Sequence, residues 1–230
     1  AETIREKGLF SEVKTAFWHG EPALSQVLST VTADEAYIVP IFKSEGHFTT
    51  VILPREMNLT GRVTERSDPV GPRRVHLCQA VGTHPYVPDL VHNLAKTTAV
   101  AKLFEPKDTD LLVIGHGGKA SRGSELATNR VAEVLRERKS FKSVGALFLE
   151  QPPEIEKWRE AIGGKVVVAV PYLIGGGGHD REIPDRLGLP PESTSGTVGG
   201  VHVAVSTSVG EMDDLARLIV EQVKSYQRHE

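Results

Sequence analysis

The sequence predicts an α/β fold of two similar three-layer domains, each with a parallel sheet between helices and a Rossmann-like topology. Three observations predict it. The two halves of the chain repeat each other, short apolar runs recur along each half, and helical patterns separate these runs. Alternation of strands and helices is typical of a parallel sheet with right-handed crossover connections.

The internal repeat places the second half 131 residues after the first, so that Ala132 corresponds to Ala1. On this register ten residue pairs are identical within the first forty residues, without a gap. The first-half members of these pairs are Ala1, Glu2, Arg5, Glu6, Phe10, Val13, Phe17, Pro22, Val39 and Pro40. Farther along, GHF and ILPREMNLTG resemble GHD and EIPDRLGLPP with a shift of one residue. Self-similarity at a fixed period indicates a repeated structural unit.

Apolar runs and helical patterns give the elements in order. Because the runs of the second half scarcely alternate with polar residues, we expect strands that are buried on both faces. These runs are 111–115, 144–149, 166–170 and 201–205, with helices expected at 124–139, 153–162, 181–187 and 211–226. The first half predicts strands at 13–18, 36–39 and 75–78 and helices at 21–29, 48–57 and 87–102.

A polar segment with a proline, residues 103–110, separates the repeats. It predicts a first domain over residues 1–105 and a second over residues 106–230. Residues 111–131 would correspond to positions before Ala1, and the chain has no initiator Met. We therefore expect the chain to be an excerpt that begins inside a helix and whose first domain lacks its first strand.

The composition excludes several classes of protein. Of the 230 residues, 39% are hydrophobic and 25% are charged, as in ordinary globular proteins. The net charge of -3 gives no overall basic field for nucleic acid or an anionic membrane. No apolar run approaches the roughly 20 residues that cross a bilayer, and the single cysteine, Cys78, excludes an intrachain disulfide. We expect a cytoplasmic protein without nucleic-acid or membrane partners, and the sequence leaves an oligomer open.

Polar side chains follow three strands of the second half where each strand ends. His116 follows the first strand, Glu150 the second and His179 the third. Ligands of open parallel sheets bind at the carboxyl ends of the strands, and neighbouring strands lie about 4.8 Å apart. Imidazole nitrogen and carboxylate oxygen accept divalent cobalt, nickel, iron or zinc. The three side chains therefore predict a divalent metal site, which rests on topology because no short-range motif such as HExxH is present.

Other interpretations of these residues remain open at this point. His116 also suits a turn between glycines, Glu150 also suits a helix N-terminus, and the glycines before His179 also suit a flexible loop. The run GHGGKA matches a dinucleotide fingerprint, G-x-G-x-x-A. Against that alternative, Glu150 follows Ala120 by 30 residues, whereas the acid of the fingerprint follows by about 20. A phosphohistidine-type hydrolase would need Arg where Gly115 stands.

The motifs LLVIGHG, FLEQPP and VPYLIGGGGHDREIPDRLG together resemble the class II chelatases of the sirohydrochlorin cobaltochelatase type. The resemblance covers most of residues 110–226, and FWHGEP, VPIFKSEGHFT and VGTHP resemble the other domain of that family. It implies two similar chelatase-like α/β domains with a cleft where a divalent metal enters a modified tetrapyrrole. By matching motif, His116 and His179 take the place of two metal-handling histidines. Glu150 takes that of a carboxylate that assists in some members.

The sequence also departs from the family pattern. In the first half His19 stands at the position of Glu150 and His47 at that of His179, while no residue of the chain corresponds to His116. Four glycines replace the mixed residues usual before the second histidine. Whether a longer protein would use His19 and His47 is a question that the sequence leaves open.

The resemblance implies a metallochelatase, a lyase of cobalamin or siroheme biosynthesis. Its substrates would be a sirohydrochlorin-type tetrapyrrole and a divalent metal, Co²⁺ before Fe²⁺ or Ni²⁺, and no nucleotide cofactor is expected. Near pH 7 most unperturbed imidazole side chains carry no charge, so they can bind a metal ion, and they can also accept a proton. Glycines at both loops would admit a flat ring, and nearby cations would bind its carboxylates. These residues are Gly117, Gly118, Gly176, Gly177, Lys119, Arg122 and Arg181.

Two alternative functions remain. The first is a non-catalytic carrier of a tetrapyrrole or a metal with the same fold. The second is a nucleotide-binding α/β module, which the glycine-rich turn after residues 111–115 suggests. Turnover separates the chelatase from a carrier, and nucleotide affinity separates it from the module.

Overall fold

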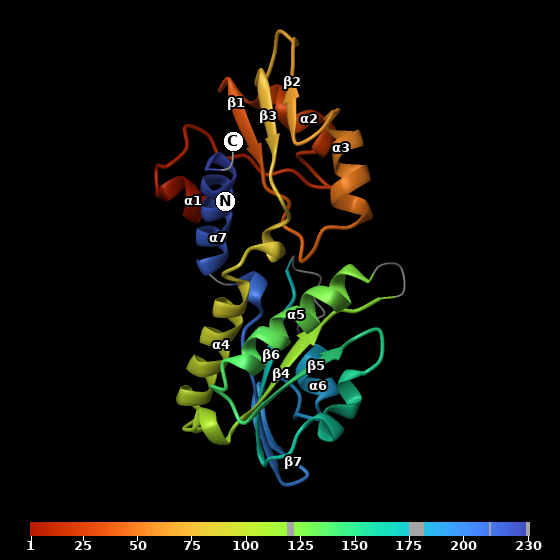
Figure 1. Cartoon of the computed structure of the whole chain (residues 1–230), viewed down its shortest axis with the longest axis vertical. Coiled ribbons are helices and arrows are strands. Elements are labelled where there is room, and N and C mark those ends of the chain that lie inside the picture. Colours follow the sequence, from red (N-terminus) through yellow and green to blue (C-terminus); the bar gives the residue numbers. More distant parts are fainter. Residues whose placement is uncertain (119–121, 175–181, 212, 229–230) are drawn as a thin grey trace. The chain divides into compact units, whose positions relative to one another are not determined.

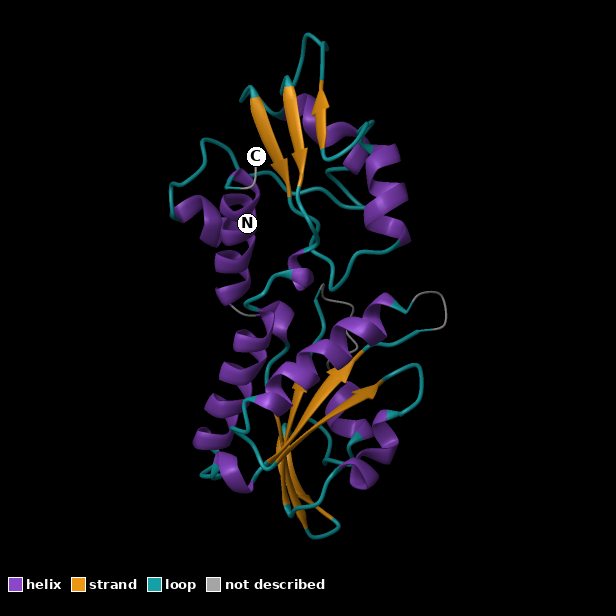
Figure 2. Cartoon of the chain, viewed as in Figure 1, coloured by secondary structure: helices purple, strands orange, loops and turns teal. Residues whose placement is uncertain are grey.

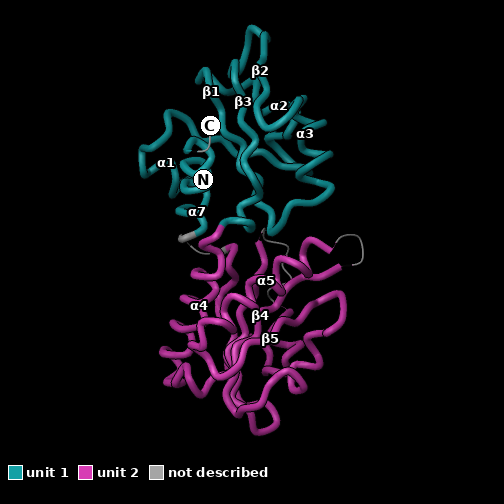
Figure 3. Tube along the Cα trace, viewed as in Figure 1, with its two compact units in different colours: residues 1–84, 213–230 teal, residues 85–212 magenta. Residues whose placement is uncertain are grey.

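A computed structural model describes residues 1–118, 122–174, 182–211 and 213–228 of the chain. The chain divides into two compact units, one formed by Ala1–His84 with Asp213–Glu230 and the other by Pro85–Met212 (Figure 3). Each unit has its own sheet and its own helices (Figure 2). Among the described residues, no helix is long and apolar enough to span a bilayer.

The second unit is built on a five-stranded sheet in the order β5-β4-β6-β8-β7 (Figure 1). Its strands are β4 (Asp110–Gly115), β5 (Ser143–Phe148), β6 (Val166–Pro171), β7 (Ser195–Val198) and β8 (Val201–Val205). β4 pairs in parallel with β5 and β6, and β6 pairs in parallel with β8, which confirms the predicted parallel sheet. β7 pairs antiparallel with β8. It was not predicted, because its residues SGTV form no apolar run.

The helices of the second unit cover both faces of this sheet. They are α4 (Val87–Ala101), α5 (Gly123–Glu137) and α6 (Ile183–Arg186), with 3-10 segments at Pro106–Asp108, Ile155–Ala161 and Val209–Glu211. In α5 the buried residues Thr128, Val131, Ala132 and Leu135 recur at helical spacing on one face. The helix predicted at 153–162 is instead a 3-10 segment, in which Lys157 has non-helical dihedral angles.

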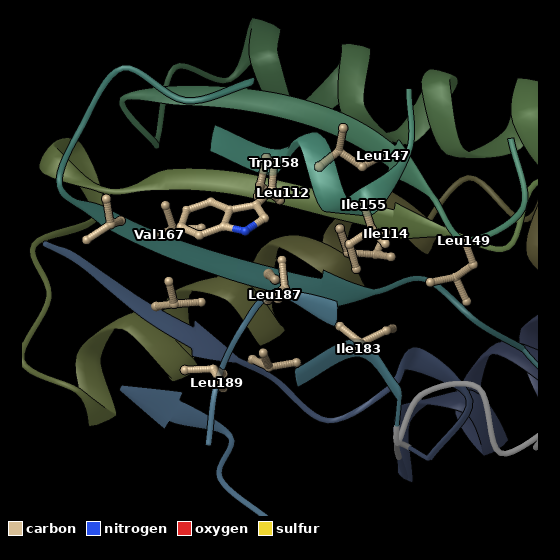
Figure 4. Packing of buried hydrophobic residues seen from close by; sticks show 14 residues of the cluster. Leu112, Ile114, Leu147, Leu149, Ile155, Trp158, Val167, Ile183, Leu187 and Leu189 are labelled. Atoms are coloured by element: carbon tan, nitrogen blue, oxygen red, sulfur yellow. The ribbon is translucent and has the colours of Figure 1, made fainter. Parts of the chain in front are cut away.

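The core of the second unit explains why the sequences of its strands are almost uninterrupted runs of apolar residues. All six residues of β4 are buried. Leu112 and Ile114 join Leu147 of β5 and Ile183 of α6 in one cluster on one face (Figure 4). Because successive side chains of a strand point to opposite faces, Leu111 and Val113 face the other way, and α5 contacts β4 and β5. Burial on both faces removes the need for polar residues at alternate positions.

The first unit contains a three-stranded sheet in the order β1-β3-β2. β1 (Glu35–Ile38) pairs in parallel with β3 (Arg74–Leu77), and β2 (Val63–Glu65) pairs antiparallel with β3. The helices are α1 (Glu2–Glu6), α2 (Leu24–Val27), α3 (Leu53–Glu56) and α7 (Asp213–Gln227). A π-helical turn, Phe48–Ile52, precedes α3, and 3-10 turns lie at Leu28–Thr30 and Val81–Thr83.

The prediction of a strand at residues 13–18 is wrong. This segment forms only an isolated parallel bridge between Phe17 and Ala23. By the repeat it corresponds to β5, whose one strand neighbour is β4. Among the described residues, no strand pairs with this segment, so its backbone forms no ladder. The predicted strands at 36–39 and 75–78 are confirmed as β1 and β3, each shifted by one residue.

The two compact units divide the chain differently from the predicted domains 1–105 and 106–230. α4 lies in the first sequence half but packs with β6, β8 and α5 of the second unit. α7 ends the second half but belongs to the first unit, where the Tyr226 hydroxyl donates to the Arg62 carbonyl at 3.1 Å. Each half thus supplies its last helix to the other unit, because the apolar faces of these helices are buried there.

Candidate functional site

The candidate site lies at the carboxyl ends of β4 and β5, which are adjacent and in register. Backbone pairing continues beyond the last strand residues. The Leu149 N–H donates to the Gly115 carbonyl at 3.0 Å, and the Glu150 N–H donates to the His116 carbonyl at 3.0 Å. The sequence therefore places a histidine and a glutamate side by side by extending the strand register by one step.

His116 and Glu150 contact each other through their side chains. His116 Nδ1 lies 3.5 Å from Glu150 Oε2, and the two side chains are 37% and 53% exposed. Nδ1 also lies 3.4 Å from the Gly117 carbonyl oxygen. A carboxylate next to one ring nitrogen orients an imidazole so that its other nitrogen can coordinate a metal. The pair thus has the geometry of a histidine ligand with an acidic orienting partner, and solvent can reach it.

Gly117 and Gly118 have backbone conformations that suit glycine. Their φ angles are +77° and +120°. A Cβ atom on Gly117 would lie 2.7 Å from Gln151 Cγ, closer than real contacts allow, and at a tight 3.1 Å from Phe148 Cβ. On Gly118 it would lie 3.7 Å from Glu150 Oε2, directly beside the acid. The loop after β4 therefore brings bare backbone next to the His116–Glu150 pair.

Two further residues hold this loop, and the sequence reasoning missed both. The Gly117 N–H donates to Ser124 Oγ and the Gly118 N–H donates to Gln151 Oε1, each at 3.0 Å. Gln151 immediately follows Glu150 in FLEQPP, and Ser124 lies in the first turn of α5. Their positions next to predicted site residues were visible in the sequence. Their hydrogen bonds depend on loop conformation, which no sequence pattern encodes.

Arg122 lies at the rim of the site and is strongly exposed. Its Nε lies 3.3 Å from Glu125 Oε2, and its side chain is 78% exposed. The hydrogen bond from Arg122 is the main cause of the lowered pKa of Glu125, which also hydrogen-bonds to Gln151. Arg122 is thus positioned by an acid and remains open to an anionic ligand.

The third strand end belongs to β6, which borders β4 on its other side. The Tyr172 N–H donates to the Ile114 carbonyl at 2.8 Å, so the chain is still next to β4 just beyond β6. Tyr172 is fully buried, and burial raises the pKa of its hydroxyl. The predicted site residues farther along the sequence, Gly176, Gly177, His179 and Arg181, lie outside the described residues, as does Lys119.

A metal site of three or more ligands is not complete within residues 1–118, 122–174, 182–211 and 213–228. No group of three His, Cys, Asp or Glu side chains there could hold an ion. The structure brings two of the three predicted ligands together, His116 and Glu150. The proposed third ligand, His179, falls in the segment that the structure does not describe.

His19 and His47 of the first unit are both exposed. The His19 ring lies 5.4 Å from the Trp18 ring, centroid to centroid. His47 immediately precedes the π-helical turn. Glu45, two residues earlier, accepts hydrogen bonds from Thr49 Oγ1 and the Ala80 N–H, both at 2.7 Å. No contact between His19 and His47 is among those that the structure describes.

Comparison with known sequences finds a family model and a relative whose names agree with each other. A sequence model of the CbiX family matches residues 1–98 and 110–226. A protein of Halobacterium salinarum (strain ATCC 700922 / JCM 11081 / NRC-1), named probable sirohydrochlorin cobaltochelatase, is 34% identical over 200 residues. That match covers 80% of this chain and 68% of the relative.

Comparison with solved structures finds the same fold. DR2241 from Deinococcus radiodurans, described as structurally similar to chelatases, matches with a TM-score of 0.73 and 27% identity, over 96% of this chain and 49% of that one. The chain thus spans about half the length of DR2241. The structure of CbiX from denitrifying bacteria matches with a TM-score of 0.73 and 22% identity, over 98% and 86%. SirB from Bacillus subtilis with Fe³⁺ matches with a TM-score of 0.70 and 17% identity, over 97% and 86%.

Proposed function

The chain belongs to the CbiX family, and from that premise we propose that it is a metallochelatase that inserts a divalent metal ion into a sirohydrochlorin-type tetrapyrrole. The observation that carries the proposal is the contact of His116 Nδ1 with Glu150 Oε2 at 3.5 Å. This contact lies at the carboxyl ends of the strands, where parallel α/β sheets bind their ligands. The name of the Halobacterium relative supports the same substrate class.

We propose Co²⁺ as the preferred metal, followed by Fe²⁺ or Ni²⁺. The name of the Halobacterium relative specifies cobalt, and the matching SirB structures hold Fe³⁺ or cobalt. Imidazole and carboxylate donors accept all of these first-row ions, so the donor set does not separate them. His179 is the proposed second histidine ligand, because in the sequence it follows β6, the strand that borders β4.

The reaction replaces two pyrrole N–H protons of the ring by one metal ion, so the protein must both carry the ion and remove two protons. Glu150, beside Nδ1, would direct the other ring nitrogen of His116 toward the ion. Donation from that nitrogen displaces a water molecule from the ion. Glu150 is the proposed acceptor of the two pyrrole protons, one after the other, and its exposure of 53% lets each proton pass to solvent.

The ring would be held by bare backbone and by surface cations. Gly117 and Gly118 leave no side chain beside the His116–Glu150 pair, so a flat macrocycle could approach the sheet edge closely. Arg122 is proposed to bind a peripheral carboxylate of the ring, since a guanidinium pairs well with carboxylates. Lys119, Arg181, Gly176 and Gly177 are proposed to extend this surface.

The experiment that tests the proposal follows the absorbance of sirohydrochlorin after Co²⁺ and a small amount of protein are added. The proposal expects many ring molecules to be metallated per protein molecule, faster than without protein. One equivalent of binding without turnover would favour a carrier. Micromolar affinity for NAD or ATP in calorimetry, with no insertion, would favour a nucleotide-binding module. Repeating the assay with Fe²⁺ and Ni²⁺ ranks the metals.

A further inference from the structure

Arg186, the last residue of α6, bonds two places on the chain that flank the segment 150–155. Its Nε donates to Glu156 Oε1 at 2.7 Å, and its Nη2 donates to the Leu149 carbonyl oxygen at 2.9 Å. The hydrogen bond from Arg186 is the main cause of the lowered pKa of Glu156. A charged carboxylate thus holds the guanidinium, and the guanidinium closes the base of the segment that begins with Glu150.

The Leu149 carbonyl needs a donor of this kind because the peptide between Leu149 and Glu150 is turned. In a regular parallel strand the N–H groups of successive residues point to opposite sides. Here the N–H groups of both residues donate to the same side, to the carbonyls of Gly115 and His116.

The carbonyl of this peptide therefore points away from β4, since the N–H and C=O groups of a trans peptide point in opposite directions. β5 is an edge strand, and no strand of the described residues lies on its other side. The guanidinium of Arg186 supplies the hydrogen bond that a neighbouring strand would otherwise provide.

The turned peptide sets the direction of the Glu150 side chain. Rotating this peptide changes the ψ angle of Leu149 and the φ angle of Glu150, and with them the direction of the Glu150 Cα–Cβ bond. Its N–H end is bonded to the carbonyl of His116, the residue whose ring lies 3.5 Å from the Glu150 carboxylate. Its carbonyl end is bonded to Arg186. The peptide is thus held at both ends in the orientation that places the acid beside the imidazole.

The repeat separates this role from that of building the turn. α3 corresponds to α6 with the shift of one residue, and three backbone hydrogen bonds recur, from the N–H groups of Met57, Asn58 and Leu59 and of Leu187, Gly188 and Leu189. At the position of Arg186 the first unit has Glu56, which accepts from the neighbouring Arg55 at 2.9 Å. The same turn therefore forms without this arginine. The arginine and Glu150 occur together in the second unit, whereas the first unit has Glu56 and His19 at the two positions.

We propose that Arg186 is a positioning residue of the site, which holds the peptide before Glu150 so that the carboxylate stays beside His116 Nδ1. Arg186 acts through Glu150 rather than on the ring or the ion. The inference rests on the proposed function, because only metal insertion gives the His116–Glu150 pair its role. The orientation of the peptide can nevertheless be measured without insertion.

The first measurement follows amide hydrogen exchange in the whole chain, without metal or tetrapyrrole. In Arg186→Met, exchange at the Glu150 N–H should accelerate by about tenfold or more, the effect of losing one hydrogen bond from a charged group. Arg136→Met is the matched control, because Arg136 of α5 donates to the carbonyl of Val144, near the start of β5, also at 2.9 Å. This control should leave exchange at Glu150 unchanged.

The second measurement is a double-mutant cycle on insertion of Co²⁺ into sirohydrochlorin. Arg186→Met should lower kcat by about tenfold, as the loss of a residue that orients a metal site does, with little change in KM for the ring. In a chain that already carries Glu150→Gln, the same replacement should have little further effect. A merely structural role would lower kcat equally in both backgrounds. Arg136→Met should keep the kcat of the original chain.

Two results would overturn the inference. They are unchanged exchange at Glu150 in Arg186→Met and an equal loss of kcat in the two backgrounds. If Arg186→Met does not fold, Arg186→Lys replaces it. Its single ammonium should remain with the Glu156 carboxylate and release the Leu149 carbonyl, so faster exchange at Glu150 is expected there as well. If the original chain inserts no metal, the proposed function fails, and exchange at Glu150 alone decides whether Arg186 positions the acid.

Discussion

At the scale of single residues, the contact between His116 and Glu150 is the basis of the proposed chemistry. Their side chains lie 3.5 Å apart because the strand register continues one residue beyond β4 and β5. The pairing of these two residues could be predicted from the sequence, since both follow adjacent parallel strands. The supporting hydrogen bonds of Ser124 and Gln151 could not, because they form within loops whose conformation has no sequence periodicity.

Replacing Glu150 by Gln should slow metal insertion by about 10- to 100-fold, the usual effect of losing an orienting partner of a metal ligand. The amide keeps the size of the side chain but neither directs His116 by charge nor accepts a proton. The rate is measured by sirohydrochlorin absorbance with Co²⁺, and circular dichroism checks the fold. Glu133→Gln, on the exposed surface of α5, is the matched control. An unchanged rate in the Glu150 variant would remove this residue from the mechanism.

Replacing Gly117 by Ala should destabilise the protein by about 1–3 kcal/mol, as strained backbone positions do. The new Cβ would lie 2.7 Å from Gln151 Cγ at a φ of +77°. The displacement of Gln151 should also break its hydrogen bond from Gly118 and slow insertion. Urea denaturation and the insertion assay report the two effects. Gly163→Ala is the control, because a Cβ atom at this position would have no atom within 4 Å, and this variant should be as stable as the original chain. Equal stability of the two variants would contradict this account.

Among the elements, β4, β5, β6 and β8 could be predicted from their apolar runs, because strands buried on both faces need no alternation. The segment at 13–18 shows the limit of this reasoning. Its composition suits a strand, but a strand exists only when a neighbour accepts its hydrogen bonds. Likewise, residues 155–161 carry a helical pattern but form a 3-10 segment, with non-helical angles at Lys157.

Glu12, which immediately precedes the 13–18 segment and accepts hydrogen bonds from Thr32, provides a pH-dependent prediction. Hydrogen bonds from the Thr32 hydroxyl and the Thr32 N–H lower the pKa of Glu12 from 4.5 to about 2. Between these two values the unfolded chain binds a proton that the folded chain does not. The contribution of Glu12 to stability is therefore complete above pH 4.5 and is lost as the pH falls toward 2.

The stability difference between the original chain and Glu12→Gln should therefore shrink as the pH falls through this window. Urea denaturation at a series of pH values measures it. Glu6→Gln, an exposed position on α1, serves as the control and should keep a constant difference. A constant difference for the Glu12 variant as well would show that its hydrogen bonds to Thr32 do not stabilise the fold.

At the scale of the whole molecule, the repeat correctly indicated two sheets but not which helices cover them. A repeat register assigns each helix to the half in which it lies, whereas packing assigns α4 to the second unit and α7 to the first. Both helices are amphipathic, and the sequence states which face is apolar but not which sheet receives it. This exchange is the part of the fold that only the structure provides.

Replacing Leu90 of α4 by Ala should destabilise the second unit, although this residue lies in the first sequence half. Leu90 is fully buried, and such truncations cost about 2–5 kcal/mol. Amide exchange in β4 and β6 should accelerate, while exchange in β3 should not. Val100→Ala, 58% exposed on the same helix, is the control. Faster exchange in β3 with unchanged β6 would show that α4 stabilises the first unit instead.

The central claim, a metal-handling site at the carboxyl edge of the second sheet, is tested most directly by anomalous scattering from a crystal soaked in Co²⁺. The account predicts a cobalt peak about 2.1 Å from His116 Nε2, the usual length of a bond from imidazole to such an ion. A cobalt peak away from this edge, with His116 uncoordinated, would contradict the claim.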